Sequence, residues 1–295
     1  MQNTSHIKLI ALDLDGTLLT SQHQITARAR KAINAAQALG IRVLLATGKT
    51  YFSARQLVSE LKLTTPSVFV QGTLIYNPDG TIRHQVTLPP DVLRRIVPFA
   101  EARGACVSAY SGESILIRQP DARADLTRFH EPAPKVVGSL INAMNTYPIN
   151  KLIIATDEPR QTKALLWQAQ QMLGTSVALT MSAVQNQFEI LPRDVSKGRS
   201  VVWVARELGI DLNHVMAIGD AENDRDMIEL VGLGIAMGNA PESLKAAARY
   251  VTAANDEDGV AEALEKFVLP KPAAVETPAP AVARVEDTEE DNDDA

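Results

Sequence analysis

The feature that most constrains the fold is an alternation of short apolar segments and amphipathic segments near the start of the chain. Predicted strands and helices follow one another in the order Ile7–Leu14, Thr26–Leu39, Ile41–Ala46, Tyr51–Leu61 and Ser67–Val70. The strands are short and largely apolar, as strands buried on both faces are, and the helices carry apolar residues at helical spacing. This order predicts an α/β fold with a parallel sheet and right-handed crossovers.

The same alternation returns after residue 186. Helices and strands are predicted at Ser196–Leu208, His214–Ile218, Glu222–Leu230, Leu233–Met237, Pro241–Ala248 and Asp258–Phe267. The middle of the chain differs, because hairpin signals such as Ser111-Gly112 are mixed there with helices. We therefore expect a Rossmann-like parallel-sheet core formed by residues 1–82 and 186–270, with an α+β cap domain, residues 83–185, inserted into it.

Charge and cysteine content limit the class of protein. The eight acidic and two basic residues after residue 270 account for the whole net charge of −6, so residues 1–270 are neutral and offer no electrostatic footprint for nucleic acid. The Pro/Ala-rich and acidic segment 271–295 is predicted to be a disordered tail. A single cysteine, Cys106, excludes a disulfide framework within one chain, and no apolar run is long enough to cross a bilayer. We expect a cytoplasmic protein that binds neither nucleic acid nor membrane.

Two acidic motifs stand where predicted strands end. Residues 13–17 read Asp-Leu-Asp-Gly-Thr, and residues 219–224 read Gly-Asp-Ala-Glu-Asn-Asp. Ligands of open parallel sheets bind at the carboxyl ends of the strands. Paired carboxylates at such a place suit nucleophilic and proton-transfer chemistry, and hard oxygen ligands suit Mg²⁺. Taken alone, each motif is also typical of a polar turn or of an acidic helix start.

Two further motifs carry groups that suit a phosphate. Thr47-Gly48-Lys49 follows the strand Ile41–Ala46 and offers a hydroxyl, a flexible amide and a helix start. Lys197 begins a predicted helix, where a cation opposes the helix dipole unless an anion holds it there. Alone, the first motif is also typical of a cap or turn, and Lys197 could equally be an exposed lysine.

Together and in this order, the four motifs resemble the motif set of the haloacid dehalogenase superfamily. The resemblance extends over residues 7–268. The additional α+β unit falls between Thr47 and Lys197, an arrangement similar to subfamily IIB, the Cof-type hydrolases. Phe188–Pro192 is also similar to the return of that subfamily into its core.

The resemblance implies a role for each matching residue. Asp13 would be the nucleophile that forms an aspartyl-phosphate, and Asp15 would protonate the leaving alcohol and then activate water. Mg²⁺ would be held by Asp13, by the carbonyl of Asp15 and by Asp220, with Asp224 supporting these ligands from behind. The phosphate oxygens would be bound by Thr47, Gly48, Lys197 and Asn223.

Two positions depart from the subfamily pattern. Arg usually stands where this chain has Lys49, and Asn-Gly-Ala is frequent where this chain reads Gln71-Gly72-Thr73. Both departures bear on substrate choice rather than on the chemistry. Candidate contacts of the cap with substrate are Tyr110, Glu113, Arg118 and Arg123.

The function that the resemblance implies is that of a Mg²⁺-dependent phosphatase acting on a small phosphorylated metabolite, in particular a sugar phosphate. One alternative is a phosphomutase, or a phosphatase of the sucrose- or trehalose-phosphate type. A mutase would need a second phosphate site in the cap, and the cap sequence has no dense basic cluster. A different class, a non-catalytic phosphate-binding scaffold, predicts loss of Asp13, Asp15, Lys197 or Asp220, and all four are present.

Overall fold

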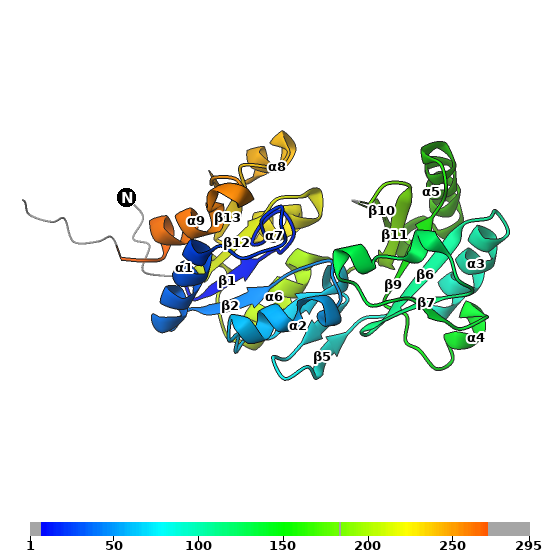
Figure 1. Cartoon of the computed structure of the whole chain (residues 1–295), viewed down its shortest axis with the longest axis horizontal. Helices are drawn as coiled ribbons and strands as arrows, with labels where there is room; N and C mark the ends of the chain where they lie inside the picture. The colour runs from blue at the N-terminus through cyan, green and yellow to red at the C-terminus, as the bar shows by residue number, and fades with distance from the viewer. Residues whose placement is uncertain (1–6, 183, 271–295) are drawn as a thin grey trace, which may run out of the picture.

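The computed structural model describes residues 7–182 and 184–270, and it consists of two lobes (Figure 1). The predicted tail, residues 271–295, lies outside the described residues. One lobe is built around a parallel sheet and contains both ends of the described chain. The other lobe, which we call the cap, is formed by the middle of the chain. No helix within the two described ranges is both long and apolar enough to cross a membrane.

The core lobe is organised around a five-stranded parallel sheet. Its strands, in spatial order, are β14 (Tyr250–Val251), β13 (Leu233–Ala236), β12 (Val215–Gly219), β1 (Leu9–Leu12) and β2 (Arg42–Leu45). All neighbouring pairs are parallel. The predicted α/β parallel-sheet fold is therefore confirmed. β1, the first strand of the chain, lies in the interior of the sheet between β12 and β2.

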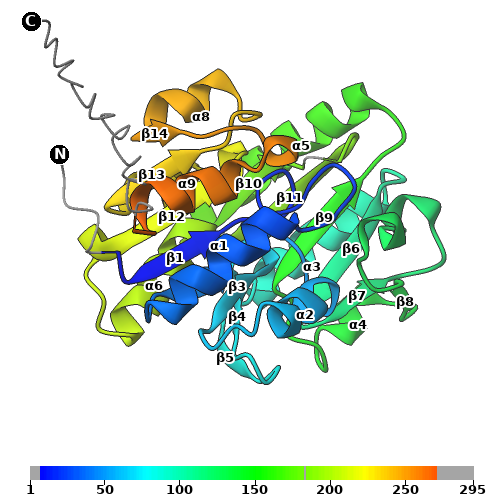
Figure 2. The ribbon, with the colours of Figure 1, turned by 60° about the vertical axis from the view of Figure 1, so that its left-hand side comes forward.

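Helices cover both faces of this sheet (Figure 2). Successive residues of a strand point to opposite faces. Ile10 and Leu12 of β1 accordingly pack with α1 and α9, whereas Leu9 and Ala11 pack with α6 and α7. The core helices are α1 (Ala27–Ala38), α2 (Tyr51–Glu60), α6 (Lys197–Glu207), α7 (Arg225–Leu230), α8 (Glu242–Ala247) and α9 (Gly259–Phe267). The β1 residues are wholly buried, so the sheet is the centre of an aliphatic core.

The predicted strand over residues 67–70 differs from expectation. It ends at Phe69 and makes a single parallel bridge to the main sheet, between Val68 and Ala46. Otherwise it belongs to a separate antiparallel sheet formed by β3 (Ser67–Phe69), β4 (Leu74–Tyr76) and β5 (Ile82–Gln85). The reason is the turn Val70–Gly72, whose three residues all have positive φ, at 49°, 58° and 96°. This turn sends the chain back along β3 instead of into a crossover helix.

The cap is a six-stranded sheet with helices on one face. Its strands, in spatial order, are β10 (Val177–Met181), β11 (Gln187–Pro192), β9 (Lys151–Ala155), β6 (Cys106–Ser111), β7 (Ser114–Ile117) and β8 (Lys135–Val136). Its helices are α3 (Pro90–Glu101), α4 (Leu140–Ala143) and α5 (Pro159–Leu173). β11 pairs with β10 and β9, so the sheet extends to Pro192, past the boundary that we expected at residue 185. Cys106 is buried in this sheet, where burial raises the pKa of its thiol to about 12.

The face of the cap sheet that carries no α-helix packs against the core lobe. Tyr110, Ile115 and Ile153 belong to the same buried cluster as Tyr51 and Tyr76 of the core. The opposite face packs on α3 and α5 through residues such as Leu152 and Phe188. The cap therefore turns this sheet face to the core, with the short helix η2 (Ala122–Ala124) covering part of it.

Candidate active site

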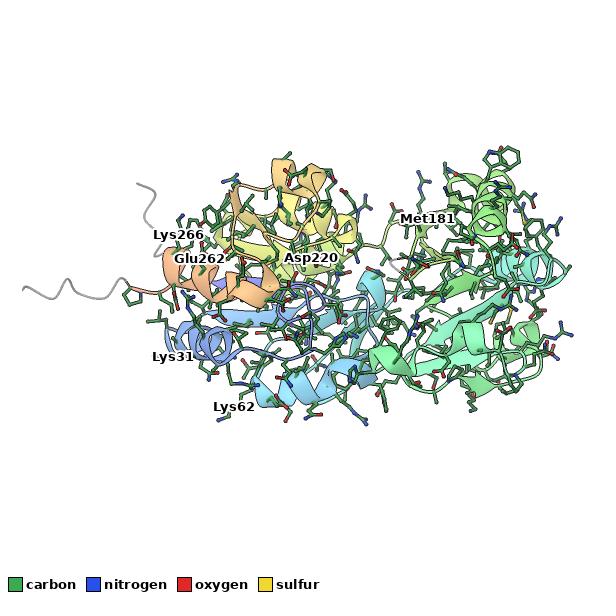
Figure 3. All side chains as sticks on the ribbon, turned by 45° about the horizontal axis from the view of Figure 1, so that its top comes forward. Lys31, Lys62, Met181, Asp220, Glu262 and Lys266 are labelled. Atoms are coloured by element: carbon green, nitrogen blue, oxygen red, sulfur yellow. The ribbon has the colours of Figure 1, made fainter. Side chains whose placement is uncertain are left out.

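The carboxyl ends of the core strands bring the four predicted motifs together. Asp13 follows β1, Thr47 follows β2 and Asp220 follows β12, while Lys197 is the first residue of α6. Because parallel strands end at the same edge of a sheet, residues separated by about 200 positions become neighbours there. Figure 3 shows Asp220 on the side of the core that faces the cap.

Lys197 is the cation at the centre of the site. Its Nζ lies 2.5 Å from Oδ1 of Asp13 and 2.8 Å from Oδ1 of Asp224, and the side chain is 2% exposed. Burial alone would lower the pKa of Lys197, but the two carboxylates outweigh it and raise the pKa above its ordinary value. Lys197 is therefore a charged, buried lysine held by two anions, which also accounts for a cation at a helix start.

Three carboxylates converge on this lysine. Oxygens of Asp13, Asp220 and Asp224 all lie within 4.8 Å of one another. Burial raises the pKa of Asp13 well above its ordinary value, against the opposing effect of Lys197. Burial and the neighbouring Asp224 raise the pKa of Asp220 to about 6. With all three acids ionised, the cluster has a net charge of −2, which a divalent cation with a preference for oxygen ligands would neutralise.

The three acids are not equivalent. Oδ2 of Asp224 accepts the backbone N–H groups of Asp220 and Ala221 at 3.0 and 3.1 Å, and Oδ1 accepts Lys197. Asp224 thus uses both oxygens to shape the loop after β12 and to hold the lysine. Asp224 is also fully buried, whereas Asp220 is only partly buried.

Asp15 occupies a different place from the other acids. It lies past the end of β1, in the turn that Gly16 makes with a φ of 79°. Its carboxylate oxygens lie 3.2 Å from Nζ of Lys49 and 3.5 Å from Nδ1 of His23. Its side chain is 45% exposed, in contrast to that of Asp13. A group at this position can meet a substrate that enters from the cap side.

The predicted phosphate-binding residues around β2 are linked by Gln71. Oγ1 of Thr47 accepts the N–H of Lys49 at 3.2 Å, which fixes the loop after the strand. Oε1 of Gln71 accepts Nδ2 of Asn223 at 3.1 Å, and a Cβ on Gly48 would lie 2.8 Å from Nε2 of Gln71. Gln71, noted from the sequence only as a departure, therefore lies between Gly48 and Asn223.

Gln71 lies in a turn whose strained backbone is fixed by hydrogen bonds. Val70 is β-branched and nevertheless has a φ of 49°, a conformation that such residues rarely adopt. Its N–H donates to the carbonyl of Lys49 at 2.9 Å, and the N–H of Gln71 donates to that of Thr47 at 3.2 Å. The strained turn is thus tied to the Thr47-Gly48-Lys49 loop through its backbone.

Two residues of the site were not predicted individually. Oγ1 of Thr17 donates to Oδ1 of Asp220 at 3.1 Å, and Nδ2 of Asn239 donates to the carbonyl of Gly16 at 2.9 Å. Asn239 comes shortly after β13, so the strand-end argument applied to that strand could have found it. Gly16 itself allows close approach, because a Cβ there would lie 2.3 Å from Oδ2 of Asp220.

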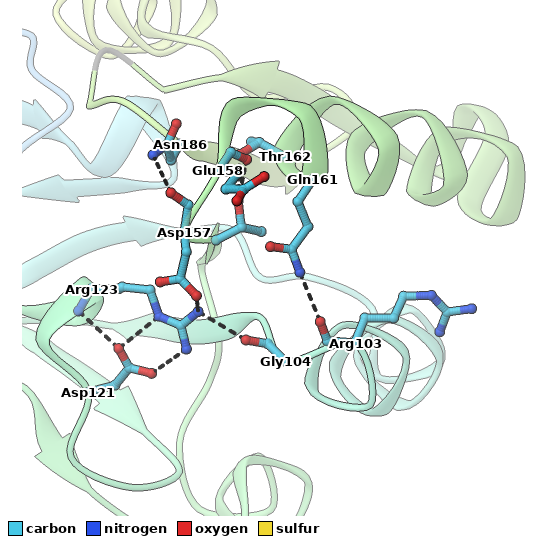
Figure 4. A network of polar contacts seen from close by, with 10 residues as sticks. Arg103, Gly104, Asp121, Arg123, Asp157, Glu158, Gln161, Thr162 and Asn186 are labelled. Carbon is cyan, nitrogen blue, oxygen red and sulfur yellow. Dashed lines mark hydrogen bonds and ion pairs between the residues drawn. The ribbon is translucent and has the colours of Figure 1, made fainter.

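Two of the candidate cap contacts pair with acids of the cap itself. Arg123 bonds Asp121 at 2.7 Å and also reaches Asp157 and the carbonyl of Gly104 (Figure 4). The hydrogen bond with Asp121 raises the pKa of Arg123. Arg118 pairs with Glu101 at 3.2 Å. Both arginines are thus paired with acids of the cap in this structure.

Comparison with known proteins identifies the family. Residues 10–264 match the family model of the haloacid dehalogenase-like hydrolases. The chain belongs to this family. The membership predicted from the four motifs is therefore confirmed, and the chain is a hydrolase of the haloacid dehalogenase type.

Individual relatives agree with this assignment over nearly their full lengths. Phosphatase YwpJ of Bacillus subtilis is 31% identical over 287 residues, covering 89% of this chain and 100% of the relative. The 5-amino-6-(5-phospho-D-ribitylamino)uracil phosphatase YcsE of the same organism is 31% identical over 264 residues, covering 89% and 96%. A haloacid dehalogenase-like hydrolase from Bacteroides thetaiotaomicron has a similar structure, with a TM-score of 0.80 at 29% identity, covering 88% of this chain and 99% of that one.

Proposed function

We propose that this hydrolase is a cytoplasmic, Mg²⁺-dependent phosphatase that cleaves a small phosphorylated metabolite, a sugar phosphate, through an aspartyl-phosphate on Asp13. The observation that carries the proposal is the cluster of three carboxylates beside Lys197, in which Asp13 and Asp224 are buried and Asp220 is partly buried. An excess of buried negative charge is costly unless a cation and an anionic substrate complete the site. Mg²⁺ held by Asp13, Asp220 and the carbonyl of Asp15 would neutralise charge on the phosphate as it is transferred.

The residues of the chain divide the reaction between them. Lys197 fixes the Asp13 carboxylate at 2.5 Å, so that a carboxylate oxygen attacks phosphorus and the bond to the leaving oxygen breaks. Asp15 gives its proton to that oxygen, and the alcohol leaves. Asp15 then takes a proton from water, whose oxygen attacks phosphorus and breaks the bond to Asp13, which releases inorganic phosphate. Thr47, Gly48, Lys197 and Asn223 bind the phosphate oxygens.

Two observations support a small ester with one phosphate. The cap packs one face of its sheet toward the core, so a substrate of limited size would be enclosed between the lobes. Arg118, Arg123 and Lys151 of the cap each pair with an acid, so these three cations form no second phosphate site of the kind a mutase needs. The ribityl phosphate named for the relative YcsE is a substrate of this chemical type.

Phosphate release measured with and without Mg²⁺ tests the proposal. The substrates are 4-nitrophenyl phosphate and a panel of sugar, nucleotide, cofactor and ribityl phosphates. We expect release by the wild-type protein and loss of release in Asp13→Asn, whose circular dichroism spectrum should show an intact fold. Release that persists in Asp13→Asn would contradict the assignment of the nucleophile. A folded wild-type protein that binds Mg²⁺ and cleaves nothing in the panel would favour the scaffold alternative.

A further inference from the structure

The side chain of Lys49 joins the two lobes at the edge of the active site. Its Nζ donates to the backbone carbonyl of Phe129, in the cap, at 2.7 Å. The same nitrogen lies 3.2 Å from Oδ2 of Asp15 in the core. The lysine is 9% exposed, so these contacts are largely screened from solvent. One ammonium group therefore binds a carboxylate of the site and the main chain of the cap.

The same cap loop reaches the core at two neighbouring points. The carboxylate of Glu131 accepts two hydrogen bonds from Thr50, one from the N–H at 3.2 Å and one from the Thr50 hydroxyl at 2.7 Å. Both residues are buried. This carboxylate lies at the first turn of α2, where the helix dipole favours an anion. The ring of His130 meets that of His23 edge-on, with 5.5 Å between centroids, and His23 is the second partner of Asp15. Residues 129–131 thus contact consecutive core residues and both partners of Asp15.

We propose that Lys49 is a positioning residue, which couples the seating of the cap loop 129–131 on the core to the orientation of the Asp15 carboxylate. This inference rests on the proposed function, in which Asp15 must face the leaving oxygen. When the loop is seated, the carbonyl of Phe129 holds the lysine ammonium, and the ammonium holds Asp15. When the loop withdraws, Lys49 loses an acceptor and Asp15 loses a fixed partner, so the carboxyl can rotate away from the leaving oxygen.

The space beside these residues has room for a leaving group. His23, Lys49 and His130 line a cavity of about 360 Å³ next to the contacts of Asp15. A leaving group in this cavity would meet both side chains that contact Asp15, and His130 of the cap loop. Seating of the loop and delivery of the Asp15 proton would then be one event, which ties bond cleavage to closure over the substrate.

A series of aryl phosphates of similar shape tests the role of Lys49. Good leaving groups, such as 4-nitrophenolate, depart without protonation, whereas phenolate departs faster with a proton. We expect Lys49→Met to lower kcat/KM for phenyl phosphate about tenfold more than for 4-nitrophenyl phosphate. Asp15→Asn should show the same pattern more strongly. Lys49→Arg, which keeps the charge and several donors, should restore most of the loss, and Lys163→Met on exposed α5 is the matched control.

The cap side of the coupling is tested with Glu131→Gln, which weakens the contact with Thr50 without changing a side chain that touches Asp15. We expect this variant to show the same leaving-group pattern as Lys49→Met. The double variant should lose much less than the product of the two single losses, because both changes act through one loop. Multiplying losses would overturn the coupling, and equal losses on both esters in Lys49→Met would overturn the positioning role.

Two outcomes separate this inference from the function on which it rests. A wild-type protein that hydrolyses both aryl esters, with an unchanged leaving-group pattern in Lys49→Met, overturns the inference alone. A wild-type protein that hydrolyses neither ester overturns the proposed function and the inference together. If Lys49→Met does not fold, Lys49→Gln replaces it, because the Gln side chain keeps an amide NH₂ group as a donor. Its melting temperature shows whether the comparison is made between folded proteins.

Discussion

At the scale of single residues, the site contains more acidic than basic side chains. Lys197 is one cation among three carboxylates, and the environment of each acid differs. Asp224 is satisfied by two backbone N–H groups and the lysine, whereas Asp220 receives Thr17 and lies against Gly16. The raised pKa of Asp220 follows from burial beside another carboxylate. In the metal-free protein, ionisation of Asp220 as the pH rises to neutral therefore opposes folding.

The pKa of Asp220 predicts how stabilisation by Mg²⁺ depends on pH. Its value rises from 3.8 to about 6 in the folded protein, so the stability linked to protonation is present below about pH 4 and is lost as the pH rises through 6. A bound cation favours the ionised carboxylate, so binding at low pH must displace a proton. We expect Mg²⁺ to raise the melting temperature by a few degrees at about pH 7.5 and much less at about pH 5.

Thermal melts with and without Mg²⁺ at the two pH values measure this effect. Asp220→Asn is the control, because it removes the titrating carboxyl and a metal ligand together. In that variant the Mg²⁺-dependent gain should be small at both pH values. An equal gain at both pH values in the wild-type protein would show that Asp220 does not bind the ion in its ionised form.

At the scale of elements, the start of α6 positions Lys197. Ser196 caps α6 by accepting the N–H of Arg199 at 3.2 Å, and its hydroxyl donates to Asp226 of α7. Lys197 is the next residue, so the N-cap residue Ser196 also fixes the point from which the lysine side chain extends. Thr26 caps α1 in the same way, accepting the N–H of Ala29 at 3.1 Å, but α1 carries none of the predicted site residues.

Substitutions of these two helix N-cap residues form a matched pair of variants. Ser196→Ala and Thr26→Ala should each lower the free energy of unfolding by about 1 kcal/mol, measured in urea. Only Ser196→Ala should also lower kcat, since only α6 carries a residue that holds Asp13. Equal kcat values in the two variants would mean that the N-cap residue Ser196 has no part in positioning Lys197.

The elements also show what the sequence could predict. Strands and helices of the core were predictable because buried parallel strands are apolar throughout and helices repeat their apolar positions. The antiparallel course of β3 was not, because it depends on positive φ at Val70, which residue preference opposes. β11 was placed with the core because Phe188–Pro192 resembles the return of the subfamily into its core, and the residues of a single strand do not show which of two sheets it joins. The four site motifs were predictable by position, but the contacts of Asp15 with Lys49 and His23 depend on tertiary packing.

At the scale of the whole molecule, all the site residues and both lobes fall within the described part of the chain. The last helix, α9, packs against α1 and completes one face of the core sheet. Deleting residues 271–295 should therefore leave both the melting temperature and the turnover number unchanged. The measurement compares the truncated and full-length proteins in the same assay. A substantial loss of either property would show that the acidic tail supports the folded enzyme.

The interior position of β1 has a consequence for how the protein is synthesised. One edge of β1 pairs with β2, about 30 residues later, but the other edge pairs with β12, about 200 residues later. At a synthesis rate of about 5–20 residues per second, that second edge stays open for roughly 10–40 s on the ribosome. The cap sheet lies within this interval and is contiguous in sequence, so it can form first. During this time the unpaired edge of an apolar strand can pair with other chains. Chaperones must prevent this pairing, because the strand that covers the edge in the finished fold has not yet been made.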